Sequence, residues 1–234
     1  MSSVGVFVIL LFISSVPAIA VFIWFRIARY PFSLPRFSFS LLAGAASFFP
    51  ALFFQNILAA GGGIFHTMDK WGLAAEIFIR IAFTEEFSRL IVLVILLFAI
   101  HRFVSAARTE QAFISDSTVA SAAGLIAGLG FAILESAVYG ASNPGNALLR
   151  TFTAAPLHGA CGFRVGSSIV MFRENPFMGL FRFLSAVVIH GVYNFMLVIP
   201  GLFSSVTAIL IALIALASSV QAIRGGMNEG MENE

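Results

Sequence analysis

Charged residues are scarce in this chain, and their scarcity decides its class. Asp, Glu, Lys and Arg make up only 10% of its 234 residues, whereas soluble domains carry roughly 25%. Apolar residues make up 59%, and the mean hydropathy is +0.99. A soluble fold is therefore excluded, and the composition predicts an all-α, polytopic membrane protein whose surroundings are the lipid bilayer. The net charge of +2 is small and no basic run is present, so nucleic acid is not an expected partner.

Cysteine and repeats are also nearly absent. The single Cys161 lies within an apolar run, which excludes a framework of intramolecular disulfides. Neither internal repeats nor low-complexity segments are evident. The chain therefore reads as one membrane domain, residues 1–222, followed by a short polar tail, residues 223–234, whose last ten residues, GGMNEGMENE, are expected to be disordered.

Long apolar runs, by contrast, fill the sequence. Crossing the hydrocarbon core takes about 20 residues, and seven runs approach that length, which predicts a bundle of about seven transmembrane helices. The first run lacks a preceding basic segment, so we expect a retained helix rather than a cleaved signal. The predicted spans are 4–25, 38–60, 80–101, 117–140, 150–172, 178–199 and 201–222.

The orientation follows from the basic residues of the short loops, because the richer side is cytoplasmic. Lys70, Arg150 and Arg80 lie on the poorer side. This distribution places the N-terminus outside and the polar tail inside. The richer side collects Arg26, Arg29, Arg36, Arg102, Arg108, Arg173, Arg182 and Arg224.

A few polar residues lie inside the predicted spans, where a charge costs at least about 2.5–3.5 kcal/mol. By their distances from the span ends, the acids and histidines fall within roughly 15 Å of one level, in the outer half of the membrane. Four helices thus deliver polar groups to one depth, which predicts a shared site. The residues are Glu85, Glu86 and Arg89 on the third span, Glu135 on the fourth, His158 and Arg164 on the fifth, and His190 with Asn194 on the sixth.

Helix geometry separates the two adjacent glutamates. Glu85 and Glu86 point about 100° apart, so one is expected to face the site and the other to pair with Arg89. Glu135 has no cation three or four residues away on its own helix, so its partner must lie on another helix. His190 and Asn194 are spaced four apart and share a face.

Other features receive structural roles. The spacing Gly124-xxx-Gly128 and Gly162-xxx-Gly166 is typical of closely packed membrane helices. Glu76 and Arg80 are predicted to pair on a short helix that leads into the third span. His66, His101 and Arg164 are not assigned to the site. The 27 phenylalanines are interpreted as residues that pack between helices or contact lipid.

At these residues the chain resembles the PrsW family of intramembrane proteases, part of a wider group with the CAAX prenyl endopeptidases and bacteriocin-processing proteases. The resemblance rests on four motifs that occur in the same order. The second motif ends in Glu135 in this chain, whereas it ends in His in the CAAX branch. The motifs are Glu85-Glu86-Phe87-Ser88-Arg89, Phe131-xxx-Glu135, Arg150 followed by His158, and His190-Gly191-Val192-Tyr193-Asn194.

The resemblance implies hydrolysis of peptide bonds in single-span or membrane-anchored substrates, such as anti-sigma factors, in a prokaryotic plasma membrane. A carboxylate removed from bulk water is a strong base. We expect Glu85 to activate a water, helped by Glu135 or His158, and His190 with Asn194 to donate to the oxyanion. Which of the two adjacent glutamates is the base stays open. Glu86, Arg89 and Arg150 would support the site, and cleavage is expected near the outer face.

Three alternatives remain open. A zinc protease could use Glu85, Glu135, His158 and His190 as ligands, although the usual H-E-x-x-H signature is absent and no cofactor is favoured. Buried acids and histidines also mark proton-coupled transporters, but no repeated half-structure is evident. A non-catalytic membrane scaffold would keep the same fold.

Overall fold

The computed structural model describes residues 3–30, 32–62, 70–104, 117–141 and 144–232, and every regular element among them is a helix. His66 and Arg108 lie outside the described residues, as do the side chains of His101 and Arg102. The all-α expectation is confirmed. The helices are α1 (Ser3–Ser14), α2 (Val16–Ile27), α3 (Leu34–Ala60), α4 (Lys70–Ala75), the π-helix η2 (Glu76–Phe83), α5 (Thr84–Val104), α7 (Ser117–Gly140), α8 (Pro144–Glu174), α9 (Pro176–Val198) and α10 (Leu202–Glu232).

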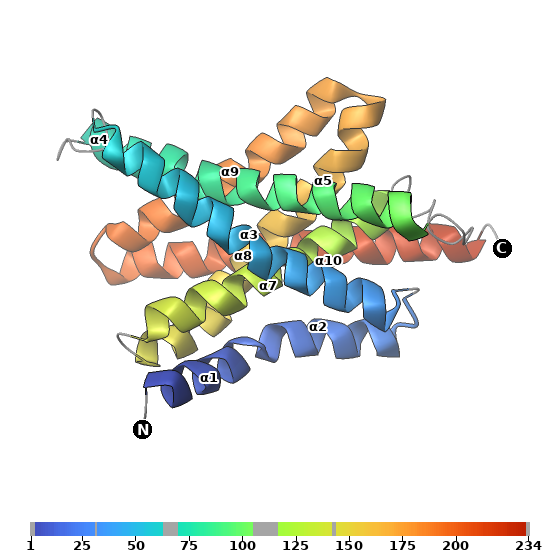
Figure 1. Ribbon diagram of the computed structural model, residues 1–234, viewed down its shortest axis with the longest axis horizontal. Helices are drawn as coiled ribbons and strands as arrows, with labels where there is room; N and C mark the ends of the chain where they lie inside the picture. The colour runs from blue at the N-terminus through green and yellow to red at the C-terminus, as the bar shows by residue number, and fades with distance from the viewer. Residues whose placement is uncertain (1–2, 31, 63–69, 105–116, 142–143, 233–234) are drawn as a thin grey trace.

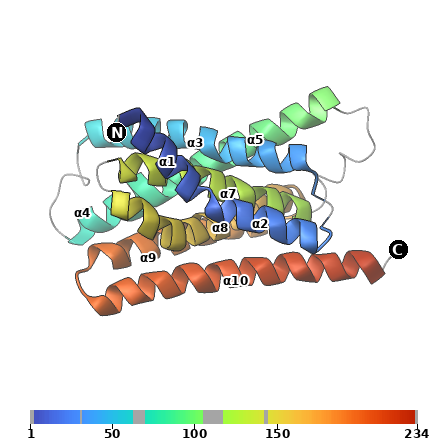
Figure 2. The same ribbon diagram turned by 90° about the horizontal axis from the view of Figure 1, so that it is seen from below.

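The helices form a bundle with α7 and α8 at its centre. In Figure 2, α3 and α5 lie along one side, α7 and α8 in the middle, and α9 and α10 along the opposite side. The central position of α7 agrees with its composition, because the helix itself carries small or apolar side chains on all faces. Of its most apolar stretch of 18 residues, 78% is buried. A helix that is apolar all round belongs in the interior of a bundle.

Glycines bring α7 and α8 into backbone contact. A Cβ added at Gly124 would overlap the carbonyl oxygen of Gly162, and one at Gly128 would overlap the carbonyl oxygen of His158. The packing role predicted for these glycines is therefore confirmed. The contact at Gly128 also fixes the height of His158 against α7.

Proline and polar caps define several helix ends. Asn175 alone separates α8 from α9, and its side-chain oxygen accepts hydrogen bonds from the backbone N–H groups of Phe177 and Met178 at 3.1 and 3.3 Å. Pro176 occupies the first turn of α9, where its missing N–H is not needed. Ser33 caps α3 in the same way through the N–H of Arg36.

Five stretches among the described residues are long and apolar enough to cross a membrane: Val4–Ile27, Leu34–Ala60, Ser117–Gly140, Pro176–Val198 and Leu202–Gly226. They correspond to five of the predicted spans, and the protein is a multi-pass membrane protein. The other two predicted spans correspond to α5, with the end of η2, and to α8; buried Glu85, Glu86 and Arg89 lie on α5, and both helices lie within the same bundle.

The structure corrects several boundaries. The predicted first span is divided into α1 and α2 at Ser15, and α8 begins at Pro144 rather than near residue 150. The expected disordered end, residues 225–234, is wrong as far as Glu232, because α10 continues to that residue. The short helix predicted before the third span is present, with Arg80 paired to Glu76, and it runs without a break into α5.

Candidate active site

The acids and histidines picked out from the sequence meet in the interior of the bundle. Helix α5 supplies Glu85, Glu86 and Arg89, α7 supplies Glu135, α8 supplies Arg150 and His158, and α9 supplies His190. Glu86 and Arg89 have no exposed surface, and the two histidines are each 1% exposed. The convergence of four helices expected from depth is therefore present.

The site lies toward one end of the bundle. Glu135 on α7 and His190 on α9 each lie about two turns or less from the last residue of their helix. Figure 1 shows these helix ends, and that of α3, at the end of the bundle opposite the C-terminus. Which membrane face this end meets stays a prediction from the loop charges.

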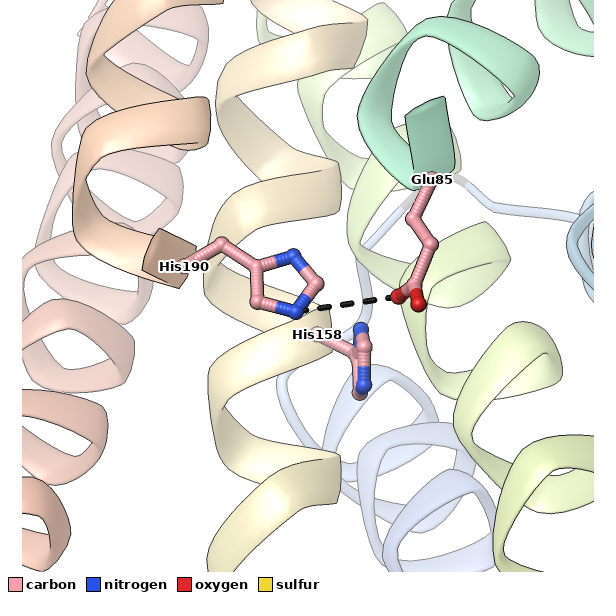
Figure 3. A group of neighbouring side chains, drawn as sticks. All are labelled: Glu85, His158 and His190. Atoms are coloured by element: carbon pink, nitrogen blue, oxygen red, sulfur yellow. Dashed lines mark ion pairs between the residues drawn. The ribbon is translucent and has the colours of Figure 1, made fainter. Parts of the chain in front are cut away.

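His190 is held between the two adjacent glutamates. Its Nδ1 lies 2.8 Å from Oε1 of Glu86, and its Nε2 lies 3.6 Å from Oε2 of Glu85, the pair joined by the dashed line in Figure 3. Because a carboxylate only accepts hydrogen bonds, the Nδ1–H donates to Glu86. In the neutral ring, the Nε2 lone pair then faces Glu85.

His158 is engaged at both ring nitrogens. Its Nδ1 lies 3.3 Å from Nη2 of Arg89, and its Nε2 lies 2.9 Å from Oε2 of Glu135. A guanidinium can only donate, so Nδ1 accepts and the Nε2–H donates to Glu135. The two imidazoles stand nearly perpendicular, with ring centroids 4.9 Å apart.

Two of the three carboxylates have a cationic partner. Glu86 is paired with Arg89, and Glu135 is paired with Arg150 from α8. The second pair confirms the expectation that Glu135 finds its partner on another helix. Buried charges need such partners, because taking an unpaired ion out of water costs several kcal/mol.

Glu85 is bonded differently from the other two glutamates. Its Oε1 accepts a hydrogen bond of 3.1 Å from Nε2 of Gln55 on α3, while its buried Oε2 has no hydrogen-bond partner among the described residues. No Lys or Arg forms an ion pair with Glu85 there; its one charge partner is His190, at 3.6 Å. Glu85 therefore has an oxygen available for a ligand or a reacting water.

A cavity of about 210 Å³ reaches this carboxylate from the side of α3 and α7. Glu85 and Glu135 supply its polar wall together with Gln55, and apolar or aromatic side chains make up the rest. The lining residues are Phe48, Ala51, Leu52, Gln55, Glu85, Phe131, Glu135, Val138 and Tyr139.

The helical segment that precedes Glu85 has an unusual backbone geometry. Residues Glu76–Phe83 form a π-helix, a form that is rare and frequently occurs at functional sites. Where the α-helix resumes, the Thr84 hydroxyl donates to the carbonyl oxygen of Arg80 at 2.6 Å. A Cβ added at Gly191 would overlap the ring of Phe78, so η2 packs directly beside His190 on α9.

Two residues differ from the expectations of the sequence, and a third, Arg164, agrees with them. Gln55 was missed; it is one of two adjacent amides, Gln55 and Asn56, within an apolar span. Asn194 is half-buried and forms no hydrogen bond or ion pair with the site among the described residues. Arg164 lies elsewhere, bonded to Ser218 and Ser219 of α10 at 3.0 and 3.3 Å, as its omission from the site implied.

The donor groups only partly suit a metal ion. Glu85, His158 and His190 can each offer one atom within 4.8 Å of the others, and a carboxylate with two imidazoles is a common zinc set. Glu85 and His190 fit, since their facing atoms are free and His190 is oriented by Glu86. His158 fits only if it gives up a hydrogen bond, and Glu135, the fourth ligand expected from sequence, is already bonded to Arg150.

Comparison with known protein families gives a match over most of the chain. The model of the PrsW-protease family, described as PrsW family intramembrane metalloprotease, matches residues 34–219. This range contains every site residue named above. No curated protein and no solved structure matches the chain.

Proposed function

The chain belongs to the PrsW family of intramembrane proteases, and from this premise we propose that it hydrolyses peptide bonds of membrane-anchored proteins with Glu85 as the base. The family supports a peptidase over a proton-coupled transporter or a scaffold. The observation that carries the choice of base is the buried Oε2 of Glu85, which has no hydrogen-bond partner among the described residues and belongs to a side chain that lines a cavity.

The geometry suits activation of a water between Glu85 and His190. A water touching both residues would donate one hydrogen bond to Oε2 of Glu85 and one to Nε2 of His190. Glu85 takes a proton as the water oxygen forms a bond with the scissile carbonyl carbon. When the C–N bond breaks, the protonated Glu85 returns this proton to the leaving amine.

The oxyanion donor is reassigned to Gln55. The neutral His190 accepts at Nε2, which supports a role in holding water in place of the oxyanion role expected from sequence. Gln55 has two N–H groups on its amide, of which one donates to Glu85. The other is available within the cavity to a carbonyl oxygen that gains negative charge.

Two ion pairs, Glu86 with Arg89 and Glu135 with Arg150, position the two imidazoles. Glu86 fixes the ring of His190, and Glu135 fixes the ring of His158. Each carboxylate is in turn held by an arginine. This arrangement gives each histidine one tautomer and one orientation before the substrate arrives.

A metal-dependent reaction is the second candidate, favoured by the family description and by the Glu85, His158 and His190 group. Zinc held there would polarise the scissile carbonyl and acidify a bound water. His158 would have to release Arg89 or Glu135 to join it. We therefore favour the glutamate reaction.

The finer features of the proposal come from the loop charges and the family resemblance. We place the site in the outer half of a prokaryotic plasma membrane, with cleavage near the outer face. We take single-span regulators resembling anti-sigma factors as the substrates. Kinship with the CAAX prenyl endopeptidases stays a prediction.

The test is cleavage in cells that co-express a panel of single-span membrane proteins. Wild type should release a fragment that Glu85→Gln does not, with a rate loss of about 10²–10⁴ for a missing base. Glu174→Gln is the matched control, because Glu174 is exposed at the end of α8. Cleavage by a well-folded Glu85→Gln variant at the wild-type rate would refute Glu85 as the base.

A further inference from the structure

Arg164 on α8 is a cation within the bundle that has no acidic partner. Its guanidinium donates to the carbonyl oxygen of Ala160 at 2.9 Å and to the hydroxyls of Ser218 and Ser219 at 3.0 and 3.3 Å. All three acceptors are neutral, and no Asp or Glu forms an ion pair with Arg164 among the described residues. The positive charge therefore lacks the counter-charge that an ion needs away from water.

The two serines hold this guanidinium at the contact between α8 and α10. Their hydroxyls both donate to the carbonyl oxygen of Ala215, at 2.8 Å from Ser218 and 2.9 Å from Ser219. A hydroxyl has one donor, so the serine oxygens meet Arg164 as acceptors. A guanidinium has five N–H groups, and its three bonds leave two of them for a ligand.

A second arginine lies at the same level on α9. From Arg182 to the end of α9 the helix rises about 24 Å, and from the start of α10 to Ser218 it rises by the same distance. A short turn joins these two helix ends and the helices pack together, so the two residues have matched depths. The charges of Arg182 and Arg164 act on each other. The guanidinium of Arg182 forms no hydrogen bond or ion pair in the described part of the chain.

The two arginines lie beside lipid, close to one membrane boundary. Both α9 and α10 are long and apolar enough to cross a membrane. Met178, one turn before Arg182, is 43% exposed, and Ile214, one turn before the exposed Ser218, is 67% exposed. A rise of about 24 Å through a hydrocarbon core about 30 Å thick ends just inside the opposite headgroups. The loop charges predict that this boundary is the cytoplasmic one.

We propose that Arg164 and Arg182 bind the phosphate of an anionic phospholipid from the cytoplasmic leaflet. A planar guanidinium presents N–H groups that match two phosphate oxygens, and basic sites between membrane helices on the cytoplasmic side bind such headgroups. The phosphate supplies the missing counter-charge, and the acyl chains lie against the exposed apolar side chains of α9 and α10. The cavity beside Glu85 is lined from α3, α5 and α7, so the lipid site is separate from it.

Thermal unfolding in a neutral detergent tests this site. Short-chain phosphatidylglycerol should raise the unfolding temperature of wild type, because a ligand that binds the folded state stabilises it, whereas short-chain phosphatidylcholine should not. Arg182→Gln should weaken the apparent affinity for phosphatidylglycerol by about tenfold, the scale of one hydrogen bond to a charged group. Arg164→Lys, which keeps the charge and loses the paired N–H groups, should weaken it by a similar factor.

Arg26→Gln is the matched control, because it removes the same charge from an exposed residue of α2 and should bind phosphatidylglycerol as wild type does. Each variant is compared with its own lipid-free unfolding temperature. Arg182→Gln removes no contact of the described residues, so its loss of affinity would not reflect misfolding.

Three results would overturn the proposal. The first is an equal shift of wild type by phosphatidylglycerol and phosphatidylcholine, which would show that no anionic site exists. The second is wild-type affinity in either Arg182→Gln or Arg164→Lys, which would show that this pair does not hold the phosphate. The third is an equal shift by inorganic phosphate at the same concentration, which would assign the site to a free anion. These measurements require no substrate, so they stand or fail separately from the proposed peptidase function.

Discussion

The carboxylate of Glu86 joins two helices through His190. Its Oε1 accepts a hydrogen bond of 2.8 Å from Nδ1 of His190 on α9, and its other oxygen is paired with Arg89 one turn along α5. All three side chains are almost completely buried. Glu86 therefore has both a structural role, as half of an ion pair, and a positioning role, as the group that sets the tautomer of His190.

These two roles can be separated by substitution. Removing one partner of a buried ion pair leaves a lone charge and costs about 3–5 kcal/mol, whereas replacing both partners with apolar residues is often neutral. We expect Glu86→Leu and Arg89→Leu each to lower the free energy of unfolding by that amount. The double variant should recover much of this stability and remain inactive, because His190 has lost its acceptor.

Thermal unfolding in detergent and cleavage of a membrane substrate measure the two effects. Recovery of activity together with stability in the double variant would show that Glu86 does not position His190. The same double substitution at the half-buried pair of Glu76 and Arg80 is a control for losing an ion pair of the same helical run, and this more accessible pair should contribute less than the fully buried one.

Gln55 should matter to the chemical step. Removing one oxyanion donor lowers kcat by about 10²–10³-fold in other hydrolases. We expect Gln55→Leu, which keeps the approximate size of the side chain, to lower kcat on this scale with little change in KM. A rise in KM with kcat unchanged would instead indicate that Gln55 only binds the substrate. Gln55→Glu, which supplies acceptors without N–H donors, should be equally slow.

The sequence identified most of the site because polar residues are costly inside a membrane. Glu135 lacked a cation on its own helix, and it is indeed bonded to Arg150 and His158 on α8. The glycine spacing likewise indicated the close contact of α7 with α8. In both cases a local rule of energy or packing determined which kind of partner had to exist.

Other features could not be predicted, because they depend on how the helices meet. The angle between Glu85 and Glu86 suggested separate partners, but an imidazole has nitrogens on two edges, and both glutamates reach His190. An amide such as that of Gln55 commonly forms hydrogen bonds between membrane helices, so the residue type alone did not distinguish a site residue from one that only joins two helices. The polar end of α10 continues as a helix, although its composition is typical of a disordered end.

Metal removal distinguishes the two catalytic types. The double engagement of His158 leads us to expect no stoichiometric zinc in protein purified without chelator, and full activity after dialysis against a chelator. Elemental analysis of the purified protein and cleavage before and after dialysis measure this. Loss of activity that zinc restores, with one bound ion per chain, would establish the metal-dependent reaction instead.

Gly128 tests whether the site depends on the contact between α7 and α8. A Cβ at this residue would overlap the carbonyl oxygen of His158, so Gly128→Ala must push α8 away from α7 at the level of the site. Overpacking of this kind costs about 1–3 kcal/mol, and we expect a lower unfolding temperature with reduced cleavage.

Gly225→Ala is the matched control, because a Cβ at that residue of α10 has nothing within 4 Å. Alanine is also the better helix former by about 1 kcal/mol, so this variant should unfold at the same or a higher temperature and keep its activity. If Gly128→Ala is as stable and active as Gly225→Ala, the two central helices have room to separate. His158 would then not be held at a fixed height by its own backbone, and its position would depend on the bonds to Arg89 and Glu135.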